Sequence, residues 1–366
     1  MFNNLRVLEL ASVLAGPSVG QFFAELGADV IKVENLKGGG DVTRTWKSAN
    51  EKTDDRSAYF SSVNWGKRSL AIDLTTPKGR DIIKALAAKS DIVIASYKPG
   101  DDLKLGVSYE DLGAINKKII YGRITGYGPL NDRVGYDAVL QAESGFMSLN
   151  GEENGPPIKM PVALIDVLAA HQLKEGLLIA LLKRERSGEG SLVDVSLIQS
   201  AIASLVNQAS NWLVGGTMPT RHGSLHPNIA PYGEWFETSD GKKILLAIGN
   251  DRQFNDLCGL LKIDNKYATN IDRVRNRKEL GDIIASKIRG LSFDQLSKDI
   301  NRLKIPAGAI KDIDEVFEQP EARELLVSGD GLRGVRSFVA GSGHFKNTLT
   351  PPPHLGQHNE EILSGL

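Results

Sequence analysis

Residues 5–34 read LRVLELASVLAGPSVGQFFAELGADVIKVE, and this stretch indicates how the chain begins to fold. The apolar run at 5–10 is typical of a buried strand, and the loop ASVLAGP separates it from a helical pattern, SVGQFFAELG. A second apolar run, ADVIKVE at 28–34, follows almost at once. A strand, a helix and another strand with short connections predict two parallel strands with the helix packed across them.

The same unit recurs twice farther along the chain. RSLAIDL at 68–74 precedes a helical pattern with Thr76 at the N-cap and Pro77 in the first turn, and DIVIASY follows at 91–97. The helical pattern YEDLGAINK then precedes the strand pattern KIIYGRI at 118–124. Repeated units of this kind predict an α/β fold, with a doubly wound, Rossmann-like parallel sheet covered by helices on both faces. Such sheets bind ligands beyond the carboxyl ends of their strands.

The second half of the chain predicts a separate, smaller domain. Two long helical patterns, at 167–190 and 198–216, flank the strand pattern SLVDVSL. A stretch rich in Gly, Pro, His and Asn then leads to the strand KKILLAIG and three amphipathic helical patterns. We therefore expect a large α/β domain at 1–205, a linker at 206–225 and a small α+β domain at 226–310. A C-terminal segment, 311–366, is expected to return to the large domain.

Composition excludes several classes of protein. The 366 residues carry 44 Lys and Arg against 45 Asp and Glu, so no basic excess favours a nucleic-acid partner. No polybasic stretch and no run of 18 apolar residues favours a membrane. The first residues lack the features of a signal peptide, and the single cysteine, Cys258, cannot form an internal disulfide. These features predict a soluble, cytoplasmic protein.

Familiar nucleotide, hydrolase and zinc motifs are missing from the sequence. It has no G-x-G-x-x-G loop, no P-loop and no G-x-S-x-G elbow. The six histidines show no spacing typical of a zinc site, so no metal is expected.

Asp166, in PVALIDVLAA at 161–170, is the most informative acidic residue. An apolar, strand-like run ends at Ile165, and a long helical pattern begins at or just after the aspartate. One interpretation is an N-cap, since Asp accepts hydrogen bonds from unpaired N–H groups at a helix start. The other is a nucleophile that the positive helix end keeps ionised. Spacing alone favours the cap.

Motifs spread over the whole chain change that balance. The opening stretch together with GGGDVTR, NWGKRSLAIDL, ITGYGP, GYD and ALID resembles the class III CoA-transferase family. HPNIAPY, DGKKILLAIGNDRQF, IPAGAI and PPPHLGQHNEEIL are similar to the later part of that family. Its superfamily includes carnitine and formyl-CoA transferases and α-methylacyl-CoA racemase. The resemblance implies an interlocked homodimer, coenzyme A as co-substrate, and Asp166 at the position of the catalytic aspartate.

The resemblance also implies the course of the reaction. In these transferases the aspartate attacks the donor thioester to give a mixed anhydride, and CoA thiolate converts the anhydride to an aspartyl-CoA thioester. The acceptor acid then takes over the acyl position. The family shields the anhydride partly with a glycine-rich loop. No run of glycines follows Asp166 here, and HPNIAPYG at 226–233 is the candidate for its place.

The remaining residues that the resemblance implies are contacts to coenzyme A, spread over several loops. They are Val13, Leu14, Ala15, Asn35, Ile72, Leu74, Thr75, Ser96, Tyr97, Lys98, Lys104, Thr125, Tyr127, Tyr136 and Asp137. Those from 96 to 104 correspond to the region of the adenosine phosphates, and those from 125 to 137 lie nearer the thioester. Leu14 replaces the glutamine of the formyl-CoA enzymes. Asn35 replaces an arginine that binds CoA in many members, and Lys32 or Lys37 are candidates to replace its charge.

Two other functions remain open at this point. A racemase of the same superfamily uses a histidine in a G-H-D segment, whereas this chain has Gly135-Tyr136-Asp137. A tyrosine titrates near 10, so it is a poor substitute for imidazole as an acid–base group. A catalytically silent CoA-binding protein would be left if Asp166 were only a cap. Members of the family exchange formate and oxalate, carnitine derivatives or dicarboxylates, and a dicarboxylate such as succinate is expected here.

Overall fold

The computed structural model describes residues 2–340 and 348–366, and the chain forms two compact units. The first unit comprises residues up to Phe146, Lys159–Gly215 and Glu321–Leu366. The second unit comprises Met147–Ile158 and Gly216–Pro320. The second unit thus includes 147–158, a short stretch that no feature of the sequence had separated from the large domain.

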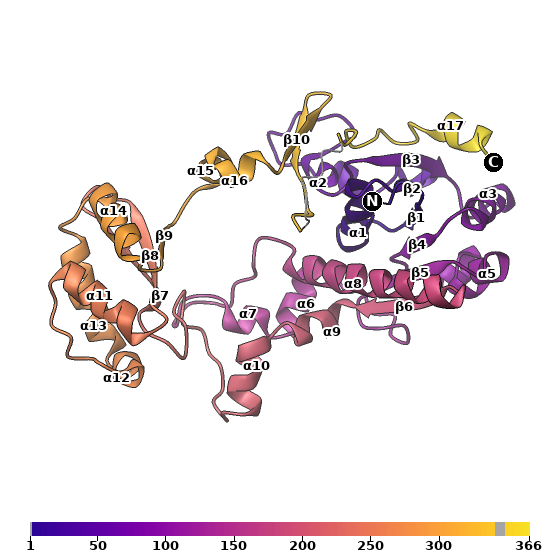
Figure 1. Cartoon of the computed structure of the whole chain (residues 1–366). Coiled ribbons are helices and arrows are strands. Elements are labelled where there is room, and N and C mark those ends of the chain that lie inside the picture. The colour runs from indigo at the N-terminus through magenta and orange to yellow at the C-terminus, as the bar shows by residue number, and fades with distance from the viewer. Residues whose placement is uncertain (1, 341–347) are drawn as a thin grey trace. The chain divides into compact units, whose positions relative to one another are not determined.

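A parallel sheet of six strands forms the centre of the first unit (Figure 1). Its order is β3-β2-β1-β4-β5-β6, and every neighbouring pair is parallel. The strands are β1 (Arg6–Leu10), β2 (Asp29–Asn35), β3 (Lys67–Ile72), β4 (Ile92–Ala95), β5 (Ile120–Thr125) and β6 (Ser191–Ser196). The predicted α/β class with a parallel sheet is confirmed. The order of the strands reverses between β1 and β4, which is where sheets of this kind bind ligands.

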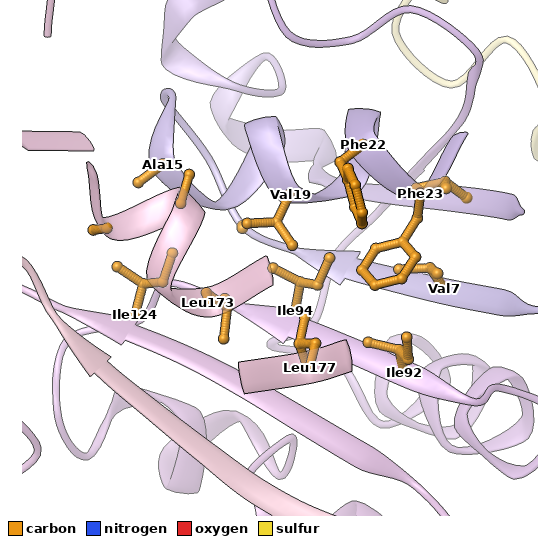
Figure 2. Close-up of a cluster of buried hydrophobic side chains, with 14 of the residues drawn as sticks. Val7, Ala15, Val19, Phe22, Phe23, Ile92, Ile94, Ile124, Leu173 and Leu177 are labelled. Carbon is orange, nitrogen blue, oxygen red and sulfur yellow. The ribbon is translucent and has the colours of Figure 1, made fainter. Parts of the chain in front are cut away.

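Helices cover both faces of this sheet. One face carries α1 (Ala15–Glu25) and α8 (Leu164–Ser187), and the other carries α3 (Pro77–Ala88) and α5 (Tyr109–Ile115). Figure 2 shows Val19 and Phe22 of α1 in one buried cluster with Ile94 of β4 and Leu177 of α8. Each such buried side chain contributes roughly 1.5–3 kcal/mol of hydrophobic stabilisation. This core fixes the starts of α1 and α8 over the sheet.

Two glycines let α8 approach the sheet closely. A Cβ on Gly122 of β5 would lie 3.0 Å from Leu173, and one on Gly176 of α8 would lie 2.6 Å from Val193. Since real side chains do not pack at the second distance, any larger residue at 176 would push the helix off β6.

Shorter elements complete the first unit. They are η1 (Leu36–Gly38), η2 (Val42–Thr45), α2 (Ala58–Ser61), α4 (Asp101–Leu105), α6 (Asp137–Glu143), α9 (Leu197–Ala203), α10 (Val206–Leu213), the hairpin of β10 (Leu326–Gly329) and β11 (Leu332–Val335), and α17 (Asn359–Ser364). Helices α7 (Phe146–Leu149) and α16 (Pro320–Arg323) lie at the boundaries between the units. The prediction of one long helix at 198–216 is wrong, because α9 ends at Ala203 and a separate helix, α10, begins at Val206. Val206, at the start of α10, has a φ of +43°, which a continuing helix does not allow.

The second unit is an α+β structure around a small antiparallel sheet. Its strand order is β7-β8-β9. Its elements are β7 (Tyr232–Glu237), β8 (Lys243–Ala247), β9 (Ala307–Ala309), α11 (Asp251–Leu261), α12 (Asn270–Arg275), α13 (Arg277–Ile288), α14 (Phe293–Leu303) and α15 (Ile313–Glu318). Its hydrophobic core includes the buried Cys258.

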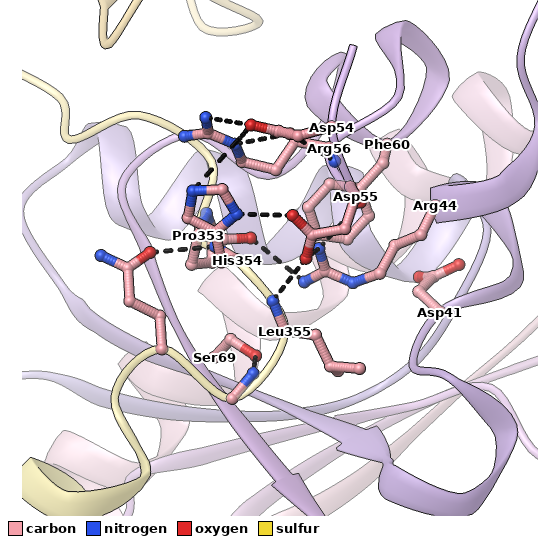
Figure 3. Close-up of polar contacts among 12 residues, drawn as sticks. Asp41, Arg44, Asp54, Asp55, Arg56, Phe60, Ser69, Pro353, His354 and Leu355 are labelled. Atoms are coloured by element: carbon pink, nitrogen blue, oxygen red, sulfur yellow. Dashed lines mark hydrogen bonds and ion pairs between the residues drawn. The ribbon is translucent and has the colours of Figure 1, made fainter.

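The C-terminal tail packs against the loop that follows β2 (Figure 3). Arg44 donates to the carbonyl oxygen of Pro353 at 3.1 Å and pairs with Asp55 at 3.2 Å. Asp55 also accepts from the N–H of Leu355 at 2.8 Å and contacts the His354 ring at 2.5 Å. These contacts join parts of the chain about 300 residues apart in sequence and stabilise the loop that carries Arg44.

Among the residues described, no helix is long and apolar enough to cross a membrane.

Candidate functional site

A pocket opens at the carboxyl ends of β1, β4 and β5, where the strand order reverses. It is lined by the loops that follow these strands, by the segment that leads into α6 and by the start of α8. Ten of the residues implied by the family resemblance line it together: Val13, Leu14, Ala15, Ser96, Tyr97, Lys98, Thr125, Tyr136, Asp137 and Asp166. The parallel sheet brings them together because its carboxyl ends share one edge.

A second pocket adjoins the first and extends toward β2. Ser12, Ser96 and Tyr97 line both pockets, and Asn35 lines the second. The other implied residues line neither of these two pockets: Ile72, Leu74, Thr75, Lys104 and Tyr127. Lys104 is exposed and pairs with Asp101 at 2.8 Å. Because the two pockets share Ser12, Ser96 and Tyr97, we refer to them together as the groove.

Asp166 does not cap a helix, contrary to the interpretation that spacing favoured. Helix α8 begins at Leu164, so Asp166 is its third residue, and the residues before the helix form no strand. Ala163 occupies the N-cap position, and its own side chain makes no hydrogen bond to the helix start. Asp137, from the first turn of α6, instead accepts a hydrogen bond from the N–H of Ile165 at 2.8 Å. The expected cap is therefore supplied by a residue that is remote in sequence.

The environment of Asp166 opposes its ionisation. Its side chain lines the pocket, yet the residue is only 7% exposed. Burial, and then the nearby charge of Asp137, raise the pKa of Asp166 to about 7. The expectation that the positive helix end keeps this carboxylate ionised is wrong, because burial and the like charge outweigh the helix end. Near neutral pH the side chain exists in both protonation states.

Two aromatic residues beside the site were missed in the sequence. Burial, followed by the charges of Asp166, Asp137 and Asp41, raises the pKa of Tyr59 on α2, so the two site carboxylates act on this ring electrostatically. Trp46 stacks edge-on against Tyr59, with ring centroids 5.1 Å apart. Both lie between β2 and β3, where the helices are only one turn long and no periodic pattern distinguishes them.

Arg133 was also missed, although it lines the first pocket. It lies over the Tyr127 ring at 4.2 Å and pairs with Glu143 at 2.5 Å. Together with Lys98 it brings positive charge to the pocket.

A buried ionic network holds the loop after β1. Val13 has a φ of +71°, an unfavourable conformation for a β-branched residue, and its N–H donates to the carboxylate of Asp41 at 3.2 Å. Asp41 pairs with Lys32 at 2.9 Å, and Lys32 also pairs with Glu9 at 3.1 Å. Burial raises the pKa of Asp41, but the charge of Lys32 and hydrogen bonds from Lys32 and Thr43 lower it by more, so the net pKa lies below its usual value. The network thus fixes a loop of the pocket.

Both lysines proposed to replace the missing arginine near Asn35 pair with carboxylates, and Lys32 also lines the second pocket. Lys32 is fully buried between Glu9 and Asp41 and also donates to the carbonyl of Ala11. Lys37 is exposed and pairs with Asp73 at 2.7 Å.

Comparisons with known proteins agree along the whole chain. The model of CoA-transferase family III matches residues 2–359. The succinate–glutarate CoA-transferase of Agrobacterium fabrum is 40% identical over 100% of this chain and 95% of that protein. The human succinyl-CoA:glutarate CoA-transferase is 37% identical over 98% of this chain and 84% of that protein. The crystal structure of a CAIB/BAIF family protein from Brucella suis has a TM-score of 0.86 and 37% identity, covering 99% of this chain and 98% of that one.

Proposed function

The chain belongs to CoA-transferase family III, and from that premise we propose that it moves coenzyme A between dicarboxylic acids with Asp166 as its covalent nucleophile. It is an enzyme of the CoA-transferase class. One observation carries the proposal for Asp166: a nearly buried carboxylate lines a pocket together with nine further residues implied to bind coenzyme A. The two relatives described above are named for succinate and glutarate, which favours dicarboxylates as the acids exchanged.

The proposed reaction uses the carboxylate of Asp166 twice. A carboxylate oxygen bonds to the acyl carbon of the donor, the C–S bond breaks, and CoA leaves as thiolate. The thiolate then attacks the aspartyl carbon of the anhydride, which releases the donor acid as a carboxylate. The acceptor carboxylate attacks the resulting aspartyl thioester, and the released thiolate takes the acceptor acyl group and frees Asp166. Each step exchanges one acyl bond for another, so no water and no redox partner is consumed.

The pKa of Asp166 gives the proposed reaction a pH dependence. Only the ionised form can attack, so the rate of the first step should rise as the pH rises through about 7. The desolvation that raises this pKa also makes the ionised carboxylate a stronger nucleophile than one in water.

The choice of acids is tested by a panel of acyl-CoA donors against free acids, with both products identified by mass spectrometry. Succinyl-CoA with glutarate, or glutaryl-CoA with succinate, should give turnover at least about tenfold faster than formate or carnitine as acceptor. Equal rates with monocarboxylic acceptors would contradict the dicarboxylate proposal. Exchange of an α-proton in deuterated water without transfer of CoA would instead indicate a racemase.

The groove is tested by a pair of lysines that differ in position. Lys98→Met should weaken CoA binding roughly tenfold, because Lys98 lines the pocket and its charge suits a phosphate. Lys89→Met is the matched control, since Lys89 lies exposed at the end of α3, lines neither pocket and is not among the residues implied to bind CoA. Titration calorimetry at two salt concentrations measures both. Equal losses in the two variants would contradict the proposed path of the CoA phosphates.

We also propose that the protein works as a homodimer, as the family resemblance implies. Helix α10 buries none of its residues, and Leu213 and the following Val214 are 78% and 87% exposed. Apolar surface of this kind is typical of an interface. Light scattering coupled to size-exclusion chromatography should give twice the chain mass of 39.7 kDa. A monomer at micromolar concentration would contradict the proposal.

A further inference from the structure

The start of α8 is held by a side-chain arrangement that its own sequence does not supply. Ala163 offers no cap, and the residues just before it form no strand. The free N–H groups at a helix start need partners, and an unpartnered buried N–H is costly. Asp137 supplies one such partner through its hydrogen bond with Ile165.

Gln141, one turn after Asp137 on α6, holds the residues that lead into α8. It is 1% exposed, and its amide oxygen accepts from the N–H of Met160 at 2.7 Å. Its amide nitrogen donates to the carbonyls of Met160 and Val162, at 3.3 and 3.4 Å, and to the second carboxylate oxygen of Asp137, at 2.7 Å. One buried side chain therefore hydrogen-bonds to both the backbone N–H and the carbonyl of Met160, and also to the carboxylate of Asp137.

We propose that Asp137 and Gln141 are positioning residues that set the location of Asp166 by bonding to the six residues, 160–165, that precede it. This inference rests on the proposed role of Asp166 as nucleophile. Asp137 bonds to the residue directly before Asp166, and Gln141 anchors the chain four to six residues before it. A displacement of about 1 Å at the attacking group can reduce a rate about 100-fold, so this clamp acts on catalysis through geometry.

Asp137 has a second effect, through its charge. Asp137 from α6 and Tyr59 from α2 interact electrostatically with Asp166, and Lys98 and Arg133 line the same pocket from its loops. Of these, Asp137 is the one whose charge raises the pKa of Asp166. The same residue thus orients the nucleophile and shifts its ionisation to higher pH, whereas Gln141 is uncharged and only orients it. This difference allows the two effects to be measured separately.

Three variants of the full-length enzyme separate these effects. Gln141→Met keeps every charge but removes the anchor, so kcat should fall at least about tenfold with an unchanged pH midpoint and a KM for the CoA donor within about threefold. Asp137→Asn keeps an oxygen for the N–H of Ile165 but removes the charge and the acceptor for the Gln141 amide nitrogen. Its kcat should therefore fall as well, and the removed charge should move the pH midpoint of kcat down by at least about half a unit, which Gln141→Met does not do. Asp137→Ala removes both and should lose the most activity.

Gln21→Met is the matched control for a buried glutamine in the same unit. Gln21 is fully buried, bonds to Glu25 and to the N–H of Trp65, and makes no contact with 160–165 among its hydrogen bonds. It should lower the melting temperature as Gln141→Met does, yet leave kcat within about threefold. If Gln21→Met and Gln141→Met lowered kcat equally, the effect of Gln141 would be general destabilisation and the positioning role would be overturned.

A single-turnover experiment distinguishes failure of this inference from failure of the proposed function. Enzyme mixed with its acyl-CoA donor is quenched in acid, and the mass of the protein shows the CoA adduct. Wild type without an adduct on Asp166 would overturn the nucleophile itself. Wild type with the adduct, and Gln141→Met forming it at the same rate, would overturn only the positioning role. A slower adduct in Gln141→Met, at an unchanged pH midpoint, is the expected result.

Discussion

Replacing Asp166 with alanine should reduce CoA transfer at least about 1,000-fold, because removal of a covalent nucleophile leaves only substrate binding to assist the reaction. Turnover with the best donor and acceptor of the panel measures this loss. CoA binding should persist, since the loops after β1, β4 and β5 still line the pocket. Hydroxylamine added during turnover should modify Asp166 in the wild type and leave the variant unchanged. Full transfer by Asp166→Ala would contradict the proposed mechanism.

Asp166→Asn should be inactive yet more stable than the wild type above pH 7. The pKa of Asp166 is about 7 in the folded protein and about 4 in an unfolded chain, so the folded state binds the proton more tightly. The wild type therefore loses stability as the pH rises from about 4 to about 7, and the loss is then complete, on the order of 4 kcal/mol. Asparagine has the same shape and no charge to bury.

Chemical denaturation at pH 4.5 and pH 8 measures this difference. The two proteins should have similar unfolding free energies at the lower pH, and Asp166→Asn should be the more stable at the higher pH. An equal difference in unfolding free energy between the two proteins at both pH values would mean that ionisation of Asp166 does not cost stability. A stabilised but inactive variant would indicate that the enzyme retains a destabilising carboxylate for its chemistry.

Lys32→Met should destabilise the first unit by about 3–5 kcal/mol, the second large effect expected. Lys32 is fully buried and pairs with Glu9 and Asp41, so its removal leaves buried negative charge without its partner. Burial lowers the pKa of Lys32, but the charges of Asp41, Glu9 and Glu34 raise it by more, so the net pKa lies above its usual value. The side chain therefore stays charged throughout the usable pH range. Glu9 keeps Lys67 at 2.7 Å, whereas Asp41 loses its charged partner. Urea denaturation measures the change.

Two further variants test the reason for this loss. Lys37→Met changes the same residue type in an exposed ion pair and should alter stability by no more than about 0.5 kcal/mol. The double variant Lys32→Met, Asp41→Asn removes both charges and keeps an oxygen for the N–H of Val13, so it should be more stable than Lys32→Met alone. If the stability changes of Lys32→Met and Asp41→Asn simply added up in the double variant, loss of the buried ion pair would not be the cause of the destabilisation.

Much of the fold could be read from the sequence because the signals are local. The strands at 5–10, 28–34 and 118–124 are apolar runs between short connections, and the structure contains a strand within or overlapping each. Thr76 does cap α3, accepting from the N–H of Gly79, since a cap depends only on the next three residues. The break at Val206 could not be read, because apolar periodicity continues across it.

The sequence by itself determined the α/β class, the parallel sheet and the family, because strand length, helix periodicity and ordered motifs are properties of neighbouring residues. It also singled out Asp166. Only the tertiary structure decided what holds that residue in place: the cap from Asp137 and the anchor from Gln141. The two hydrogen-bonded contacts join residues 19 and 28 positions apart, and the pKa of Asp166 depends on burial and on a charge from another helix. No pattern of adjacent residues encodes either quantity.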